Sequence, residues 1–241
     1  YDSRTHRYKV HDNKFNQIER RINELKPNKK VLPTDVASII GKLVAFELAT
    51  SYVPRLCCHQ YFNWIARVIQ DREHWYAPKR IPGKIVNSFK RALTFAKEFS
   101  GKIRRKQYSY EELKYTDHNS ARKYVKLAGD GNELYGAHYD VNSPHKYNVI
   151  RFDAYTIKDL SSSFRELLVL HDCVKRNAPR NKGKDLIYFT DSRVVYFWNL
   201  YGTANREIAE LLIQIKVNCL RNDVILEIAW RPRENSKIML A

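Results

Sequence analysis

Three carboxylates occupy comparable positions along the second half of the chain. Asp117 lies in KYTDHN, at a candidate first strand, and Glu166 lies in the first turn of a candidate helix. Asp191 follows the apolar run LIYF and one threonine. If the two strands are neighbours and the helix packs across them, the three acids converge. Clustered carboxylates repel one another unless cations neutralise them, and Mg²⁺ prefers oxygen ligands. Two such ions about 4 Å apart could activate a water for attack on a phosphodiester.

Each of these acids also has a purely structural interpretation. Ser163 precedes Glu166 by three residues, which is the spacing of a helix capping box. Asp191 could cap the helix that follows it, and Asp117 could lie in a turn. Taken singly, each acid is more often structural. Their joint order and context favour the metal site.

The elements that would position the acids form an α/β pattern from residue 101 onward. A hairpin with Gly131 in its turn and a strand in YNVIRFDAYTI precede a helix in SSSFRELLVLHDCVKR. The remaining elements are a strand in LIYFTDS, a short helix in VVYFWNLY, a longer helix in NREIAELLIQIKVNCLRN and a last strand in VILEIAWRPR. This order, β-β-β-α-β-α-α-β, predicts a mixed sheet with flanking helices.

The first hundred residues are expected to be mostly helical. Apolar residues recur with helical spacing in KFNQIERRINEL, LPTDVASIIGKLVAFELA and RLCCHQYFNWIARVIQ, and a fourth helix covers about residues 84 to 99. Thr34 is the expected N-cap of the second helix. A short hairpin is expected within the first 15 residues, so the chain reads as part of a longer one.

The charge of the chain favours a polyanionic partner. Lysine and arginine number 43 against 26 acids, which gives a net charge of +17. Such an excess is typical of nucleic-acid-binding proteins, although a basic protein without such a partner is the alternative. The candidate phosphate contacts, each of which could instead belong to a solvated loop, are Lys79, Arg80, Lys84, Lys102, Arg104, Arg105 and Lys106.

Cysteine usage and hydropathy indicate a reduced, intracellular protein, in the cytoplasm, the nucleus or both. The four cysteines form no CxxC pair, and Cys57 and Cys58 are adjacent. The sequence contains no apolar run of about 18 residues and no signal-peptide pattern.

The motifs in the second half together resemble the ribonuclease H domain of reverse transcriptases. YTDHN resembles the TDxS motif of the first strand, although His118 and Asn119 replace the usual small residues. SSSFREL resembles the SSxxREL helix motif, and FTDSRVV resembles the TDSxxV motif. ILEIAWRPRENSKIMLA resembles the ending WIPRExNxxAD, whose final Asp is a fourth acid that would follow Ala241.

The first half resembles another part of the same enzymes. YDSRTHRYKVHDNKFNQI resembles the end of a polymerase palm with its primer-grip hairpin, and LPTDVASIIGKLVAFELATSYVPRL resembles thumb helices. The details are most similar to DIRS-type or related tyrosine-recombinase retroelements. The resemblance divides the chain into a palm end and helical thumb-like region, 1–100, and an α/β ribonuclease H-like domain, 101–241. No YxDD-like pair occurs, so the polymerase active site is absent from this chain.

The resemblance implies a metal-dependent endonuclease that cleaves the RNA strand of an RNA–DNA hybrid gripped by the thumb. It implies that Asp117, Glu166 and Asp191 hold two Mg²⁺ or Mn²⁺ ions, and that the remaining polymerase domains are possible partners. Asn119 is a polar candidate for contact with a ribose 2′-hydroxyl, or a turn residue. The alternative function is a catalytically inactive, domesticated module that binds nucleic acid or acts as a scaffold. A basic protein unrelated to nucleic acid would require the order of the motifs to be coincidence.

Overall fold

The chain separates into two compact units. The computed structural model describes residues 3–4, 7–103, 124–152, 161–203 and 205–232. The first unit comprises residues 1–105 and 202–213, and the second comprises residues 106–201 and 214–241. Helix α11 (Arg206–Arg221) contributes residues to both units. Among the described residues, no helix is both long and apolar enough to cross a membrane.

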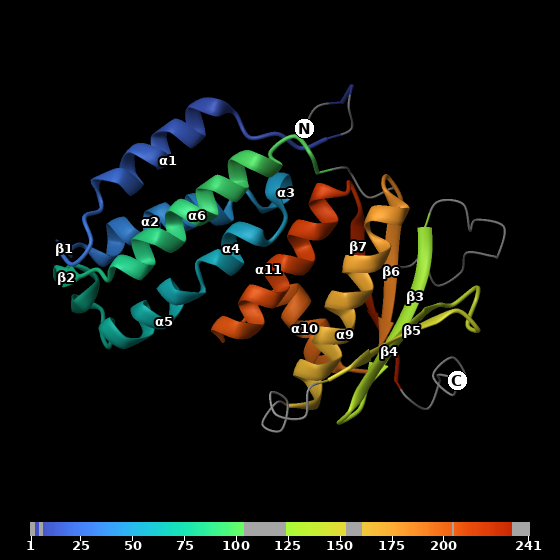
Figure 1. Cartoon of the computed structure of the whole chain (residues 1–241). Coiled ribbons are helices and arrows are strands. Elements are labelled where there is room, and N and C mark those ends of the chain that lie inside the picture. Colours follow the sequence, from blue (N-terminus) through green and yellow to red (C-terminus); the bar gives the residue numbers. More distant parts are fainter. Residues whose placement is uncertain (1–2, 5–6, 104–123, 153–160, 204, 233–241) are drawn as a thin grey trace. The chain divides into compact units, whose positions relative to one another are not determined.

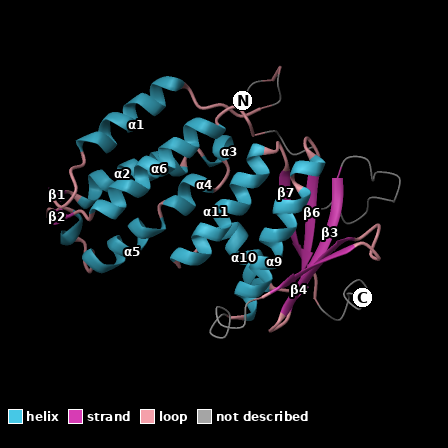
Figure 2. Cartoon of the chain, viewed as in Figure 1, coloured by secondary structure: helices cyan, strands magenta, loops and turns pink. Residues whose placement is uncertain are grey.

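The first unit is mainly helical, as the sequence predicts (Figure 2). Its helices are α1 (Asp12–Glu24), α2 (Pro33–Val44), α3 (Glu47–Thr50), α4 (Val53–Cys57), α5 (His59–Val68), the 3-10 turn η1 (Glu73–Trp75) and α6 (Gly83–Phe99). Strands β1 (Lys30–Val31) and β2 (Lys79–Arg80) form a short antiparallel ribbon. Helix α6 buries one apolar face, which includes Ile85, Phe89, Ala92, Ala96 and Phe99. These residues recur every three or four positions, the spacing of a helix that packs on one side.

Two local predictions for this unit are wrong. Helix α2 begins at Pro33 with Leu32 as its N-cap, so Thr34 lies inside the helix. Proline suits the first helical position because the backbone N–H that it lacks would have no helical partner there. The predicted third helix is divided into α4 and α5, with Cys58 between them. Tyr8 forms backbone hydrogen bonds with Gly101 and Ile103, whereas the hairpin predicted within the first 15 residues includes residues 1–2 and 5–6, which lie outside the described residues.

The second unit contains a five-stranded mixed sheet. The order along the chain is β3 (Tyr124–Gly131), β4 (Tyr135–Asp140), β5 (Tyr147–Arg151), α9 (Ser162–Asn177), η3 (Pro179–Asn181), β6 (Asp185–Thr190), α10 (Arg193–Tyr201), α11 and β7 (Ile225–Trp230). The spatial order is β5-β4-β3-β6-β7. The β3–β4 and β4–β5 pairs are antiparallel, whereas β3–β6 and β6–β7 are parallel. The predicted order of strands and helices is therefore confirmed in the described residues.

Glycines allow α9 to lie close to the sheet. A Cβ atom placed on Gly129, Gly131 or Gly136 would come within 2.9, 3.2 or 2.3 Å of the Val169 side chain. Helix α9 buries Leu167, Val169, Leu170, Cys173 and Val174, and it contacts both β3 and β4. Helix α10 contacts α9, β6 and β7 (Figure 1). This packing fixes the first turn of α9 beside the ends of the central strands.

Candidate metal site

The register of the two central strands places two carboxylates side by side. Strands β3 and β6 are parallel, and Ala128 lies opposite Phe189. Asp130 on β3 comes two residues after Ala128, and Asp191, just beyond β6, comes two residues after Phe189. Because parallel strands keep the same register, these two acids meet at one edge of the sheet.

Glu166 joins these two acids from the second turn of α9, rather than from the first turn as predicted. One carboxylate oxygen each from Asp130, Glu166 and Asp191 lies within 4.8 Å of the other two. We call these residues the acid triad. Asp130 is exposed, and the other two are half-buried, so the triad is accessible to a substrate on one side.

The donor set of the triad fits Mg²⁺ or Mn²⁺. Both are hard cations that prefer carboxylate oxygens, and Mg²⁺–O distances of about 2.1 Å allow two ligands of one ion to lie up to about 4.2 Å apart. The oxygens of the triad lie within 4.8 Å of one another. Small rotations of the three side chains would therefore bring them close enough to bind one ion together. The cation would also neutralise the mutual repulsion of three like charges.

Hydrogen bonds fix the backbone of Asp191 and exclude its predicted alternative role. The Ser192 hydroxyl accepts from the Val195 backbone N–H at 3.3 Å, so Ser192 caps α10. The indole Nε1–H of Trp230 donates to the backbone carbonyl of Asp191 at 3.0 Å. Asp191 therefore precedes the cap and is held from β7.

The predicted capping box on α9 is also wrong. The N-cap is Ser161, whose hydroxyl accepts from the Phe164 backbone N–H at 3.3 Å. Ser163 is the second residue of the helix, so it cannot act as the N-cap, and Ser163 and Glu166 do not form a capping box. Glu166 is thus not part of the cap and belongs to the triad instead.

A buried tyrosine lies close to the triad. Tyr188 is 1% exposed, and a Cβ on Gly129 would lie only 2.5 Å from its hydroxyl oxygen. Burial raises the pKa of Tyr188 well above its usual value, and the neighbouring Cys173, Glu166, Asp130 and Asp191 raise it further. The phenol therefore stays neutral and adds no charge beside the acids.

The structure brings together two of the three predicted acids. Asp117 and Asn119 lie outside the described residues, as do Arg104, Arg105 and Lys106. Asp130 was not predicted from the sequence, although it is the last residue but one of the strand YVKLAGDG and precedes a glycine. Asp130 shows the same sequence pattern that identified Asp191, which is an acid near the end of a partly apolar strand. The hairpin interpretation placed the turn at Gly131, whereas β3 includes Gly131 and the turn follows it.

The predicted basic residues of the first unit form two groups. Lys79 and Arg80 make up β2, and Arg80 lies opposite Lys30 on β1. Lys84 is exposed in the first turn of α6, directly after that ribbon. Lys102 is exposed beyond the other end of α6, with its ammonium nitrogen 5.7 Å from the centre of the Phe99 ring. The 17 residues of α6 separate the two groups by about 25 Å.

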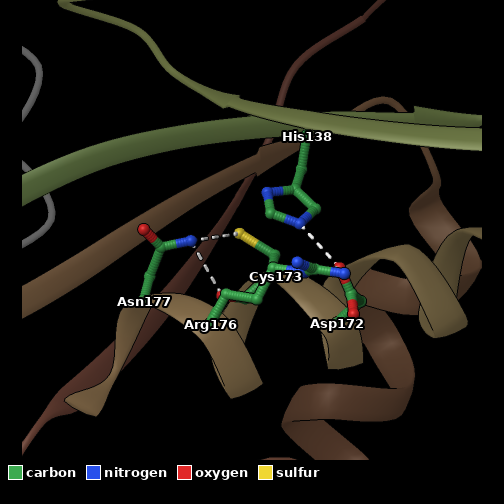
Figure 3. A network of polar contacts seen from close by, with 5 residues as sticks. All are labelled: His138, Asp172, Cys173, Arg176 and Asn177. Carbon is green, nitrogen blue, oxygen red and sulfur yellow. Dashed lines mark hydrogen bonds and ion pairs between the residues drawn. The ribbon is translucent and has the colours of Figure 1, made fainter. Parts of the chain in front are cut away.

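A second polar cluster links α9 to β4 and pairs opposite charges (Figure 3). His138 is fully buried, and its Nε2 donates to Oδ2 of Asp172 at 2.9 Å. Arg176 Nε donates to the same oxygen at 2.6 Å. Burial lowers the pKa of His138, although the hydrogen bond to Asp172 acts in the opposite direction. We call His138, Asp172 and Arg176 the histidine network.

Comparisons with known proteins reveal distant likenesses to solved structures. No known protein family matches the chain, and no curated protein matches it. A foamy viral protease–reverse transcriptase, designated dRH, in complex with double-stranded DNA is 9% identical, with a TM-score of 0.34 over 92% of this chain and 35% of its own. Another foamy viral protease–reverse transcriptase with double-stranded DNA is 10% identical, with a TM-score of 0.34 over 88% of this chain and 41% of its own. The chain thus spans less than half the length of either viral chain, and its function has to be argued from its own site.

Proposed function

We propose that the second unit is a ribonuclease H-like, metal-dependent endonuclease that cleaves the RNA strand of RNA–DNA hybrids. The observation that carries this proposal is the acid triad, in which oxygens from β3, α9 and the end of β6 lie within 4.8 Å of one another. The net charge of +17 supports a nucleic-acid substrate. The sequence motifs around Glu166 and Asp191 support the reaction class.

Each triad residue has a distinct part in this proposal. Asp130, the exposed member, faces the substrate, and Glu166 and Asp191 complete the oxygen ligands from the protein side. When bound, Mg²⁺ or Mn²⁺ supplies charge neutralisation and an activated water for in-line displacement at phosphorus. The rigid ends of β3, β6 and α9 would hold the carboxylates in place and so reduce the reorganisation needed in the transition state. One or two ions would suit the site, and Asp130 takes the role that the sequence predicts for Asp117.

The helical first unit would grip the hybrid as a thumb does in a reverse transcriptase of the DIRS type. The ribbon residues Lys79 and Arg80 and the nearby Lys84 present cations together, and each phosphate that they bind releases condensed counterions. Replacement of these three residues by glutamate should weaken hybrid binding, and the slope of log affinity against log salt should fall by about 0.9 for each phosphate that the variant no longer binds. An unchanged slope in a salt titration would place the binding surface elsewhere.

A cleavage assay on a labelled RNA–DNA hybrid tests the proposed activity. The chain should cleave the RNA strand with Mg²⁺ or Mn²⁺ but not with EDTA, and Asp191→Asn should abolish cleavage while circular dichroism shows an intact fold. Cleavage that persists in Asp191→Asn would refute the site. Salt-sensitive hybrid binding without cleavage would identify an inactive nucleic-acid-binding module.

A further inference from the structure

A pocket of about 730 Å³ adjoins the acid triad on strands β3, β4 and β5. Asp130 lines this pocket and is also a member of the triad. The other side chains on its wall that matter here are Asn132, Tyr135, Tyr139, His145 and Tyr147. A ligand in the pocket would therefore lie next to any phosphate that is held at the triad.

The strand register shows which face of the sheet forms the pocket. A side chain added at Gly129, Gly131 or Gly136 would point toward Val169 on α9. Because side chains alternate along a strand, Ala137 and Tyr139 on β4 project from the opposite face. Tyr139 on β4 lies directly opposite Tyr147 on β5, so both rings belong to that face.

The residues that line the pocket differ in size. Three glycines and Ala137 have no large side chain, whereas Tyr135, Tyr139 and Tyr147 contribute aromatic rings. Tyr147 is 64% exposed and Tyr135 is 44% exposed, so these rings offer apolar faces to solvent. Two of the lining residues belong to an Asx turn, in which Asn132 Oδ1 accepts from the backbone N–H groups of Leu134 and Tyr135 at 2.8 Å.

We infer that this pocket binds an unpaired nucleobase of the strand whose phosphate lies at the acid triad. Tyrosine rings on an open sheet face stack on the flat faces of bases that are not stacked in a duplex. Asp130 connects the two sites, and the positive chain attracts the polyanion that carries the base. The inference rests on the proposed function, and it extends the substrate from a simple hybrid to a hybrid with an unpaired segment.

The test compares hybrid ligands that differ only in one base. Fluorescence anisotropy would measure the affinity of the Asp191→Asn chain, which keeps the RNA intact, for a blunt hybrid and for a hybrid with a single-stranded RNA extension. A third set of ligands would carry an abasic site at successive positions of the extension. Tyr147→Ala should weaken binding of the extended hybrid about tenfold, the scale of one base–aromatic stack. The same variant should change the affinity for the blunt hybrid by less than twofold. The affinity for the hybrid whose extension lacks the base at the stacked position should also change by less than twofold.

Two control variants separate stacking from other effects. Tyr147→Phe keeps the ring and should bind the extended hybrid within twofold of the parent. Tyr201→Ala removes a ring that is also 64% exposed but lies at the end of α10, and it should have no effect. Equal losses for all ligands, or no loss with Tyr147→Ala, would overturn the inference while hybrid binding and cleavage still supported the proposed function. Failure of every hybrid to bind would overturn both.

Discussion

Helix α9 carries two polar clusters, and they differ in the charges that they bring together. Near its beginning, Glu166 meets Asp130 and Asp191, so three groups of like charge converge. Six residues further along, Asp172 accepts hydrogen bonds from His138 and Arg176, so unlike groups meet. Hydrogen-bonded opposite charges stabilise a fold by themselves, whereas converging like charges favour a cation. The same helix thus carries a structural cluster and a candidate functional one.

The largest effect should come from the triad and should appear in activity rather than stability. Glu166→Gln keeps the size of the side chain but removes one anionic ligand. Cleavage should fall by more than the 10- to 100-fold that is typical for residues that only support a metal ligand. Urea unfolding without metal should give a free energy no lower than that of the parent chain. A clear loss of stability with retained cleavage would assign Glu166 to the structure instead.

The histidine network should show the opposite behaviour. Asp172→Ala removes the acceptor of a fully buried imidazole, and such an unsatisfied group costs about 1–3 kcal/mol. Arg176→Ala, at a half-exposed guanidinium, should cost less than about 1 kcal/mol. Urea unfolding measures both changes. Cleavage by the folded fraction should match the parent chain, and a selective loss of cleavage in Asp172→Ala would show that the two clusters do not differ in role.

The order of strands and helices along the chain, and the helical first half, can be predicted from patterns that are local in the sequence. Apolar residues recur every third or fourth position in α6 and α9 and alternate or cluster in the strands, and these periods reflect which face each element buries. The predicted helix boundaries are less accurate. Ser161 and Ser163 are two residues of the same type within SSS, and only the folded backbone selects Ser161 as the cap.

The candidate site could be predicted only in part. Glu166 and Asp191 stand out because one lies at the start of a helix and the other follows a strand. The third acid depends on which strand pairs with β6, and that contact joins segments about 60 residues apart. Asp117 and Asp130 both lie near the expected first strand, and local sequence does not decide between them. The register of β3 against β6 places Asp130 beside Asp191.

A smaller effect should appear in the pH dependence of stability. Burial lowers the pKa of His138 below 6.5, and burial together with Lys175 lowers that of His171. The unfolded chain then binds protons more readily than the folded chain, so stability should fall as the pH drops below about 6.5. The hydrogen bonds from Arg176 and His138 outweigh the burial of Asp172 and lower its pKa below 3.8, which adds a further loss at more acidic pH.

Unfolding free energies at several pH values check this prediction. His138→Gln should flatten the fall between pH 7 and pH 5 in part, because His171 still contributes. A curve that is insensitive to His138→Gln would show that the network does not control stability in this range.

We propose that Asp130 completes the metal site with Glu166 and Asp191, in the role that the sequence predicts for Asp117, and this assignment can be measured. We would compare the rates of Mg²⁺-dependent cleavage of an RNA–DNA hybrid by Asp130→Asn and Asp117→Asn, prepared in the same chain. Asp130→Asn should lose cleavage by more than about 100-fold and Asp117→Asn should stay within about threefold of the parent, because Asp130 belongs to the triad. Full activity in Asp130→Asn with loss in Asp117→Asn would show that the assignment is wrong.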